Sequence, residues 1–230
     1  MVGGLSFAQE KSAVSKMKNI VAGAALALAA GFAASSANAA VIVNGSFEDG
    51  PNPGSFTTLA NGSTAINGWT VGGNGIDYIG TLWKAADGVR SLDLSALDAG
   101  GISQTFATVV GKTYKVSFSL AGNPDGGFGN KVLVTTLGLG QLPEIETFTV
   151  GASNTHENMG WQTITYSFVA NSTSSTLNFA SATKGPYGPA LDNVVVSAVP
   201  EPATWAMMIV GFGAAGTMVR NRRKLGAVAA

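Results

Sequence analysis

The chain offers few side chains for covalent or acid–base chemistry. Its 230 residues include one histidine, His156, and no cysteine, which excludes thiolate zinc sites, cysteine nucleophiles and disulfide scaffolds. No Gly-x-Ser-x-Gly elbow is present, and the glycine-rich stretch 122–131 lacks the Gly-Lys-Ser/Thr of a phosphate loop. Four acids close in sequence could supply the carboxylate pair of a glycoside hydrolase, although scattered surface acids are the commoner explanation: Asp77, Asp87, Asp93 and Asp98. We expect a protein without catalytic residues, with His156 a solvated loop residue.

Aromatic side chains are better candidates for ligand contact, because their rings stack on the C–H faces of sugars. Trp69 and Trp161 each follow a glycine at an expected strand start and are predicted to lie in the core. Trp83 has polar neighbours typical of a loop, and Tyr187 lies in the proline- and glycine-rich turn 184–189. We therefore predict Trp83 and Tyr187 as the ligand-binding residues.

The segment that must position these residues, 40–199, reads as strands and turns. Apolar residues alternate strictly with polar ones over 114–120 and 163–168, the period of a strand with one buried face. Turn clusters such as 49–54 and 122–127 separate the runs. Shorter strands are expected at 41–43, 66–71, 76–79, 91–94, 102–108, 131–136, 147–150, 176–180 and 191–196. Eight to ten short strands at this spacing predict an all-β fold, an antiparallel jelly-roll β-sandwich.

The first 39 residues have the pattern of a secretory signal peptide. Three lysines precede an apolar run at 20–34, and Ala37-Asn38-Ala39 forms a small-residue cleavage site, with Met17 an alternative start. An uncleaved anchor helix is the other interpretation, although the run is short and rich in alanine and glycine. Cleavage by signal peptidase is expected after Ala39.

The C-terminal segment has the opposite charge order. Residues 203–219 carry no charge and predict a single transmembrane helix, with the basic cluster and the tail 225–230 on the cytoplasmic side. A buried core helix is the alternative. Residues 200–224 resemble the PEP-CTERM sorting tail in its PEPxxWA variant, which implies processing by a membrane-embedded exosortase. The residues that carry the resemblance are Pro200, Glu201, Pro202, Trp205, Arg220, Arg222 and Arg223.

The body itself resembles a known family. The segments 44–48, 76–80, 87–94 and 188–194 are similar to the choice-of-anchor C family, a relative of the plant cell-wall domain-of-unknown-function family 642. The more distant pattern is similar to jelly-roll carbohydrate-binding modules of the galactose-binding-like superfamily. This resemblance implies a galactose-binding-like sandwich and association with polysaccharide.

The same resemblance implies a possible structural calcium ion. In jelly-roll modules the first and last strands meet, and the carboxylates at the positions of Glu48 and Asp192 commonly help to hold calcium. Two acids and loop carbonyls would form part of the oxygen shell that Ca²⁺ prefers. The alternative is that Glu48 caps a turn and Asp192 orders the last strand.

The net charge of the segment 40–199 bears on the kind of molecule that it can bind. Six basic and eleven acidic residues lie between 40 and 199, a formal net charge of −5, which excludes the basic face of a nucleic-acid binder. We therefore expect an exported, non-catalytic protein, held at the inner membrane as a precursor and then at the cell surface or outside the cell, that associates with polysaccharide. The alternatives are an enzyme that acts on polysaccharide and a self-associating structural matrix protein.

Overall fold

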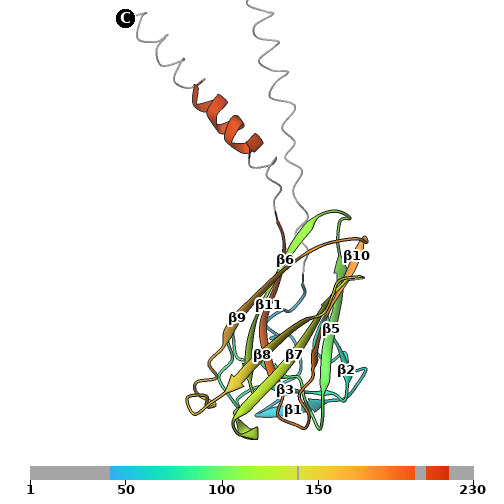
Figure 1. Cartoon of the computed structure of the whole chain (residues 1–230), viewed down its shortest axis with the longest axis vertical. Coiled ribbons are helices and arrows are strands. Elements are labelled where there is room, and N and C mark those ends of the chain that lie inside the picture. The colour runs from blue at the N-terminus through green and yellow to red at the C-terminus, as the bar shows by residue number, and fades with distance from the viewer. Residues whose placement is uncertain (1–41, 139, 200–205, 218–230) are drawn as a thin grey trace, which may run out of the picture. The chain divides into compact units, whose positions relative to one another are not determined.

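The computed structural model describes residues 42–138, 140–199 and 206–217. Two antiparallel sheets stack face to face as a jelly-roll β-sandwich (Figure 1). The strands are β1 (Phe56–Leu59), β2 (Thr70–Gly73), β3 (Ile76–Ile79), β4 (Ser91–Asp93), β5 (Gly100–Ala107), β6 (Thr113–Gly122), β7 (Gly129–Leu137), β8 (Glu144–Val150), β9 (Gln162–Val169), β10 (Ser174–Ser181) and β11 (Pro189–Ala198), with a short 3₁₀ helix η1 (Pro124–Gly126) after β6. The predicted fold class is confirmed.

The strand order explains how distant segments come together. The six-stranded sheet has the order β1-β3-β4-β11-β6-β9, and the five-stranded sheet has the order β2-β5-β10-β7-β8. The last strand, β11, therefore lies between β4 and β6, with Leu191 opposite both Leu92 and Leu120. The expected strand at 41–43 does not form over its described residues, because the backbone of Val43 bonds to the Gln104 side chain instead.

The core lies between the sheets and follows the alternation of the strands. On β6, Tyr114, Val116 and Phe118 are at most 1% exposed, and Phe118 packs edge-on against Phe179 of β10 with ring centroids 4.9 Å apart. Trp69 is buried as predicted, whereas Trp161 is only partly buried against the core. All buried residues of this described core lie between Phe47 and Val196, so the segment 40–199 contains its own core.

The turn before β1 is built on backbone conformations that are unusual for residues with side chains. Asn44 and Phe47 have φ of 56° and 59°, a region that asparagine tolerates and phenylalanine rarely adopts. The Asn44 side chain donates to the backbone oxygens of Asp49 and Asn67 and accepts from the Asp49 N–H. Trp69 donates its indole N–H to the Asn44 carbonyl at 3.0 Å. These bonds hold the strained turn against the core.

The two sheets differ in width at one side of the sandwich. The edge strand of the five-stranded sheet, β8, packs mainly opposite β6, and it contacts β9 through the hydrogen bond that Tyr166 Oη donates to Glu146 Oε1 at 2.9 Å. The edge strand of the six-stranded sheet, β9, therefore extends one strand further and lies at the margin of the sandwich in Figure 1. Its inward-facing Ile164 and Tyr166 are only partly buried.

A helix over residues 206–217 follows the sandwich in the sequence. Among the residues that the structure describes, no helix has both the length and the apolar character needed to cross a membrane. The ends of the expected span, 203–205 and 218–219, lie outside the described residues, as do the expected signal peptide 1–39 and the tail 225–230.

Candidate functional site

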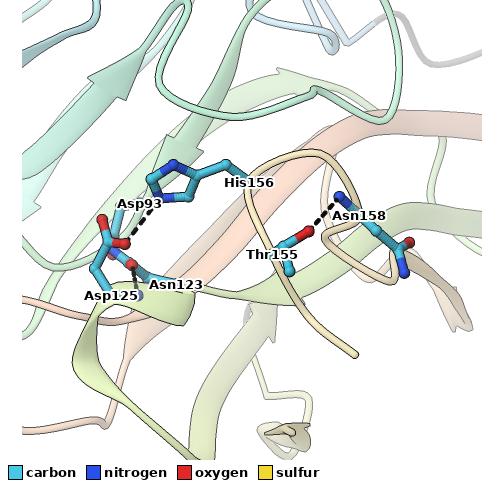
Figure 2. A network of polar contacts seen from close by, with 6 residues as sticks. All are labelled: Asp93, Asn123, Asp125, Thr155, His156 and Asn158. Carbon is cyan, nitrogen blue, oxygen red and sulfur yellow. Dashed lines mark hydrogen bonds and ion pairs between the residues drawn. The ribbon is translucent and has the colours of Figure 1, made fainter. Parts of the chain in front are cut away.

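Three loops meet at the end of the sandwich where β4 ends and β11 begins. η1 presents Asp125, the loop between β8 and β9 presents His156, and the turn before β11 presents Tyr187. Figure 2 shows Asp125 and His156 pointing toward each other from their two loops, with 2.8 Å between Asp125 Oδ1 and His156 Nε2. The Asp125 side chain is 42% exposed and the His156 side chain is 38% exposed, so this pair faces solvent.

A chain of hydrogen bonds connects this pair to a buried carboxylate (Figure 2). The Asp125 N–H donates to Asn123 Oδ1 at 2.8 Å, and Asn123 Nδ2 donates to Asp93 Oδ2 at 2.7 Å. Asp93 also accepts the backbone N–H groups of Ser95 and Gly188. The Asp93 carboxylate thus ties together the end of β4, the start of η1 and the turn that carries Tyr187.

Burial determines the charge of Asp93. The side chain is fully buried, and its removal from water raises its pKa to about 7, against the opposing effect of its hydrogen bonds to Asn123, Ser95 and Gly188. No ion pair to Asp93 is found among the described residues. The carboxylate therefore changes protonation near neutral pH.

Tyr187 is the exposed aromatic side chain of this end. It is 42% exposed, and a Cβ added to Gly126 would lie 2.8 Å from its ring and 2.6 Å from its own Cβ, so the side chain lies directly on the backbone of η1. Lys131 donates its ammonium to the Tyr187 carbonyl at 2.8 Å from beneath the turn. Burial lowers the pKa of this lysine. The ring therefore packs on Gly126, the residue that follows Asp125 in η1.

Trp83 does not present the exposed ring that its polar neighbours suggested. The side chain is 4% exposed, packs with the core and donates its indole N–H to Ser91 Oγ of β4 at 2.8 Å. A buried ring has no face free to stack on a sugar, so the expectation of an exposed platform at Trp83 is wrong. Its indole instead fixes the loop 81–90 to the sheet, near His156, whose ring centroid is 6.4 Å away.

Glu48 and Asp192 meet the same loop but do not form an oxygen cage. Glu48 Oε1 accepts the N–H groups of Val89 and Arg90, each at 2.7 Å. Asp192 Oδ2 accepts those of Ala86 and Asp87 at 2.7 and 2.9 Å. N–H donors thus occupy Glu48 Oε1 and Asp192 Oδ2, and the part of the chain that the structure describes contains no group of three or more His, Cys, Asp or Glu side chains suited to a metal. The calcium ion expected at Glu48 and Asp192 stays a prediction.

The four acids considered for hydrolysis are engaged in separate contacts. Asp77 bonds to Thr58, Asp87 accepts from Ser46, and Asp98 accepts the N–H groups of Ala99 and Gly185. Asp77 and Asp93 alone are direct neighbours among them, as Cα partners across β3 and β4.

The Asp125–His156 pair is a feature that the sequence did not reveal. The two residues are 31 positions apart in the sequence. One follows a strand of the six-stranded sheet, and the other follows a strand of the five-stranded sheet. The glycine- and proline-rich composition of 122–127 indicated a turn, but no periodicity connects that turn to the loop around His156. The sorting-motif residues Pro200, Glu201, Pro202, Trp205, Arg220, Arg222 and Arg223 lie outside the described residues.

Comparison with known proteins gives two family matches. Residues 40–197 match the model described as "Protein of unknown function (DUF642)", and residues 198–224 match the PEP-CTERM protein-sorting motif. The chain is 32% identical over 171 residues to Halomucin of Haloquadratum walsbyi (strain DSM 16790 / HBSQ001), a match over 70% of this chain. The chain spans 2% of the length of this curated relative.

Solved structures of carbohydrate-binding modules show weak likeness to the chain. A CBM4 module is 18% identical with a TM-score of 0.40, over 69% of this chain and 100% of that one. The CBM35 module from Paenibacillus barcinonensis is 21% identical with a TM-score of 0.42, over 62% of this chain and 99% of that one. A CBM61 module in complex with β-1,4-galactotriose is 14% identical with a TM-score of 0.38, over 66% and 94% of the two chains. Likenesses of this size identify no ligand for this chain.

The two family matches together cover the sandwich and the segment that follows it, and the sorting motif marks an exported protein that exosortase sorts. The predicted resemblance to family 642 and to the PEP-CTERM tail is confirmed: the chain belongs to the DUF642 family and carries a PEP-CTERM sorting motif.

Proposed function

We propose that this exported protein is a non-catalytic polysaccharide-binding protein of the cell surface or extracellular matrix, and that the loop end with Tyr187 contacts the sugar. Its C-terminal segment anchors the precursor in the membrane until exosortase acts. Signal peptidase removes the leader.

The observation that carries the proposal is the exposed ring of Tyr187, packed on the same 3₁₀ helix η1 that presents Asp125 to His156. A sugar presents apolar C–H faces and hydroxyl groups together, so a binding surface needs a ring for stacking and neighbouring polar groups for the hydroxyls. The tyrosine supplies the ring. The carboxylate and imidazole supply an acceptor and a donor without any loop having to reorganise.

The net charge of the domain favours an uncharged ligand. Its formal charge of −5 repels polyanions. The domain has six basic side chains, among them Lys84, Lys131 and Lys184, and Lys131 is buried and therefore not available to bind an anion. Neutral polysaccharides carry no such penalty.

Binding of purified 40–199 to an array of neutral and anionic glycans, followed by titration calorimetry, tests the proposal. Tyr187→Ala is expected to weaken binding at least tenfold, because it removes the stacking surface. The control Phe56→Ala removes an aromatic side chain that is 48% exposed on β1 and should leave affinity unchanged. Absence of binding to every glycan would contradict the proposal, and release of reducing sugar would identify an enzyme instead.

A further inference from the structure

The edge strand β9 lacks the devices that normally protect the edge of a sheet. Gln162–Val169 is eight residues long, contains no charge, proline or glycine, and pairs with β6 on one side. Natural edge strands are usually short or carry charges that prevent pairing with another chain. The other edges follow that rule, since β1 and β2 have four residues each and β8 carries Glu144 and Glu146.

The overhang of β9 also leaves apolar side chains incompletely covered. The inward-facing Ile164 and Tyr166 are only partly buried, although Tyr166 Oη reaches Glu146 of β8, whereas their partners Phe118 and Val116 on β6 are at most 1% exposed. A strand added beside β9 would cover the exposed parts of both side chains and pair the backbone groups on the side of β9 that no other described strand occupies.

We propose that the occupant of this edge is β9 of a second copy of the chain, paired antiparallel about a twofold axis at Thr165. Residues opposite each other in an antiparallel pair lie on the same face of the sheet. This register places Thr165 opposite Thr165 of the second copy, Thr163 opposite Ser167, and Ile164 opposite Tyr166. Hydroxyl side chains then meet on the outer face and apolar ones on the inner face, both favourable types of cross-strand pair.

Charge explains why two copies would meet at this edge. Each domain has a formal charge of −5, so two copies repel one another over most of their surface. β9 offers eight positions without any charge. A slip of one residue would bring Ile164 and Tyr166 to the wrong face and is excluded, and among the remaining registers the one centred on Thr165 pairs Thr165 with itself and Ile164 with Tyr166. The paired edge is roughly 27 Å long, so the dimer is weak in dilute solution and is favoured where copies are concentrated on a surface.

Single cysteine variants test the pairing, because the chain has no cysteine of its own. In this register the two Thr165 Cα atoms lie roughly 4.5–5.5 Å apart, within the range of a disulfide. Mild oxidation of Thr165→Cys in 40–199 should therefore give a covalent dimer. Thr163→Cys should remain monomeric, since the two cysteines at position 163 of the dimer would be roughly 13 Å apart. Thr163→Cys/Ser167→Cys should restore crosslinking, because position 163 of one copy lies opposite position 167 of the other. Thr147→Cys on β8 is the matched control and should not crosslink.

Analytical ultracentrifugation provides the second measurement. Wild-type 40–199 should show a rising dimer fraction with concentration, and Thr165→Lys should lower the association constant at least tenfold by placing two ammonium groups opposite each other. The same substitution at the exposed Thr147 should have no effect. A monomer at every concentration without Thr165→Cys dimers would overturn the proposal, as would equal crosslinking of all the cysteine variants. Pairing of β9 with a different protein would leave the purified domain monomeric and would also overturn it.

Discussion

The Asp93 carboxylate is buried among polar groups and forms no ion pair with another described residue, although the Lys131 ammonium is near enough to interact with it electrostatically. It accepts N–H groups from Asn123, Ser95 and Gly188, yet loss of water raises its pKa from 3.8 to about 7. Asp192 is also fully buried, and burial raises its pKa to about 7 as well. Both groups therefore bind protons more tightly in the folded chain than in the unfolded chain.

This difference makes the stability of the domain depend on pH. The stabilising contribution is complete below pH 3.8 and is lost as pH rises toward and through about 7, because folding then forces a buried carboxylate to ionise. We expect the free energy of unfolding in urea to be higher at pH 5 than at pH 8, by on the order of 2 kcal/mol for each group. Asp93→Asn keeps an acceptor oxygen but cannot ionise, so it should reduce the difference. A wild-type profile that is flat or rises toward pH 8 would contradict this expectation.

At the scale of elements, the loop 81–90 is hydrogen-bonded by one residue from the first part of the domain and by one residue from its last strand. Glu48 binds its 89–90 amides, and Asp192, at the bulge of β11, binds its 86–87 amides. The first and last parts of the domain therefore meet through this loop.

Substitution of Glu48 separates this hydrogen-bonding role from a metal-binding one. Glu48→Ala leaves two N–H groups without their acceptor and should cost about 1–3 kcal/mol of unfolding free energy. Glu48→Gln keeps an acceptor oxygen and should cost less. Thermal unfolding should be the same in calcium and in chelator. A melting temperature that rises with calcium in the wild type but not in Glu48→Gln would show that a metal binds there after all.

The sequence predicted those elements that are determined by residues close together in the chain. The alternation over 114–120 gives β6, and the proline- and glycine-rich turn gives an exposed Tyr187. Trp83 was misleading because its polar neighbours describe the loop, whereas its own indole packs down toward Ser91 of another element. The Asp125–His156 pair depends on two loops that only the strand order brings together, and strand order leaves no periodic trace in the sequence.

At the scale of the whole molecule, we expect two cuts to define the exported form. We expect the intact mass of the protein recovered outside the cell to correspond to a chain that begins at Ala40 and ends near the Pro200–Pro202 motif. Signal peptidase acts after small residues, and Pro200–Pro202 belongs to the segment that matches the PEP-CTERM sorting motif.

Substitution of the two prolines provides the control for this prediction. Pro200→Ala/Pro202→Ala should keep its C-terminal segment and remain with the membrane fraction. Recovery of an uncut chain in the medium, or equal processing of the variant, would contradict the expected route.

β11 runs the full length of the sandwich, and this sets how the domain is displayed. Its first residue, Pro189, follows the turn of Tyr187, and its last, Ala198, lies just before the sorting motif. Ten residues of strand separate these points by roughly 30 Å. The turn that carries Tyr187 and the residue Val199, after which the chain continues into the sorting motif, therefore lie at opposite ends of β11. We expect a polysaccharide bound at Tyr187 to contact the domain roughly the length of this strand away from Val199.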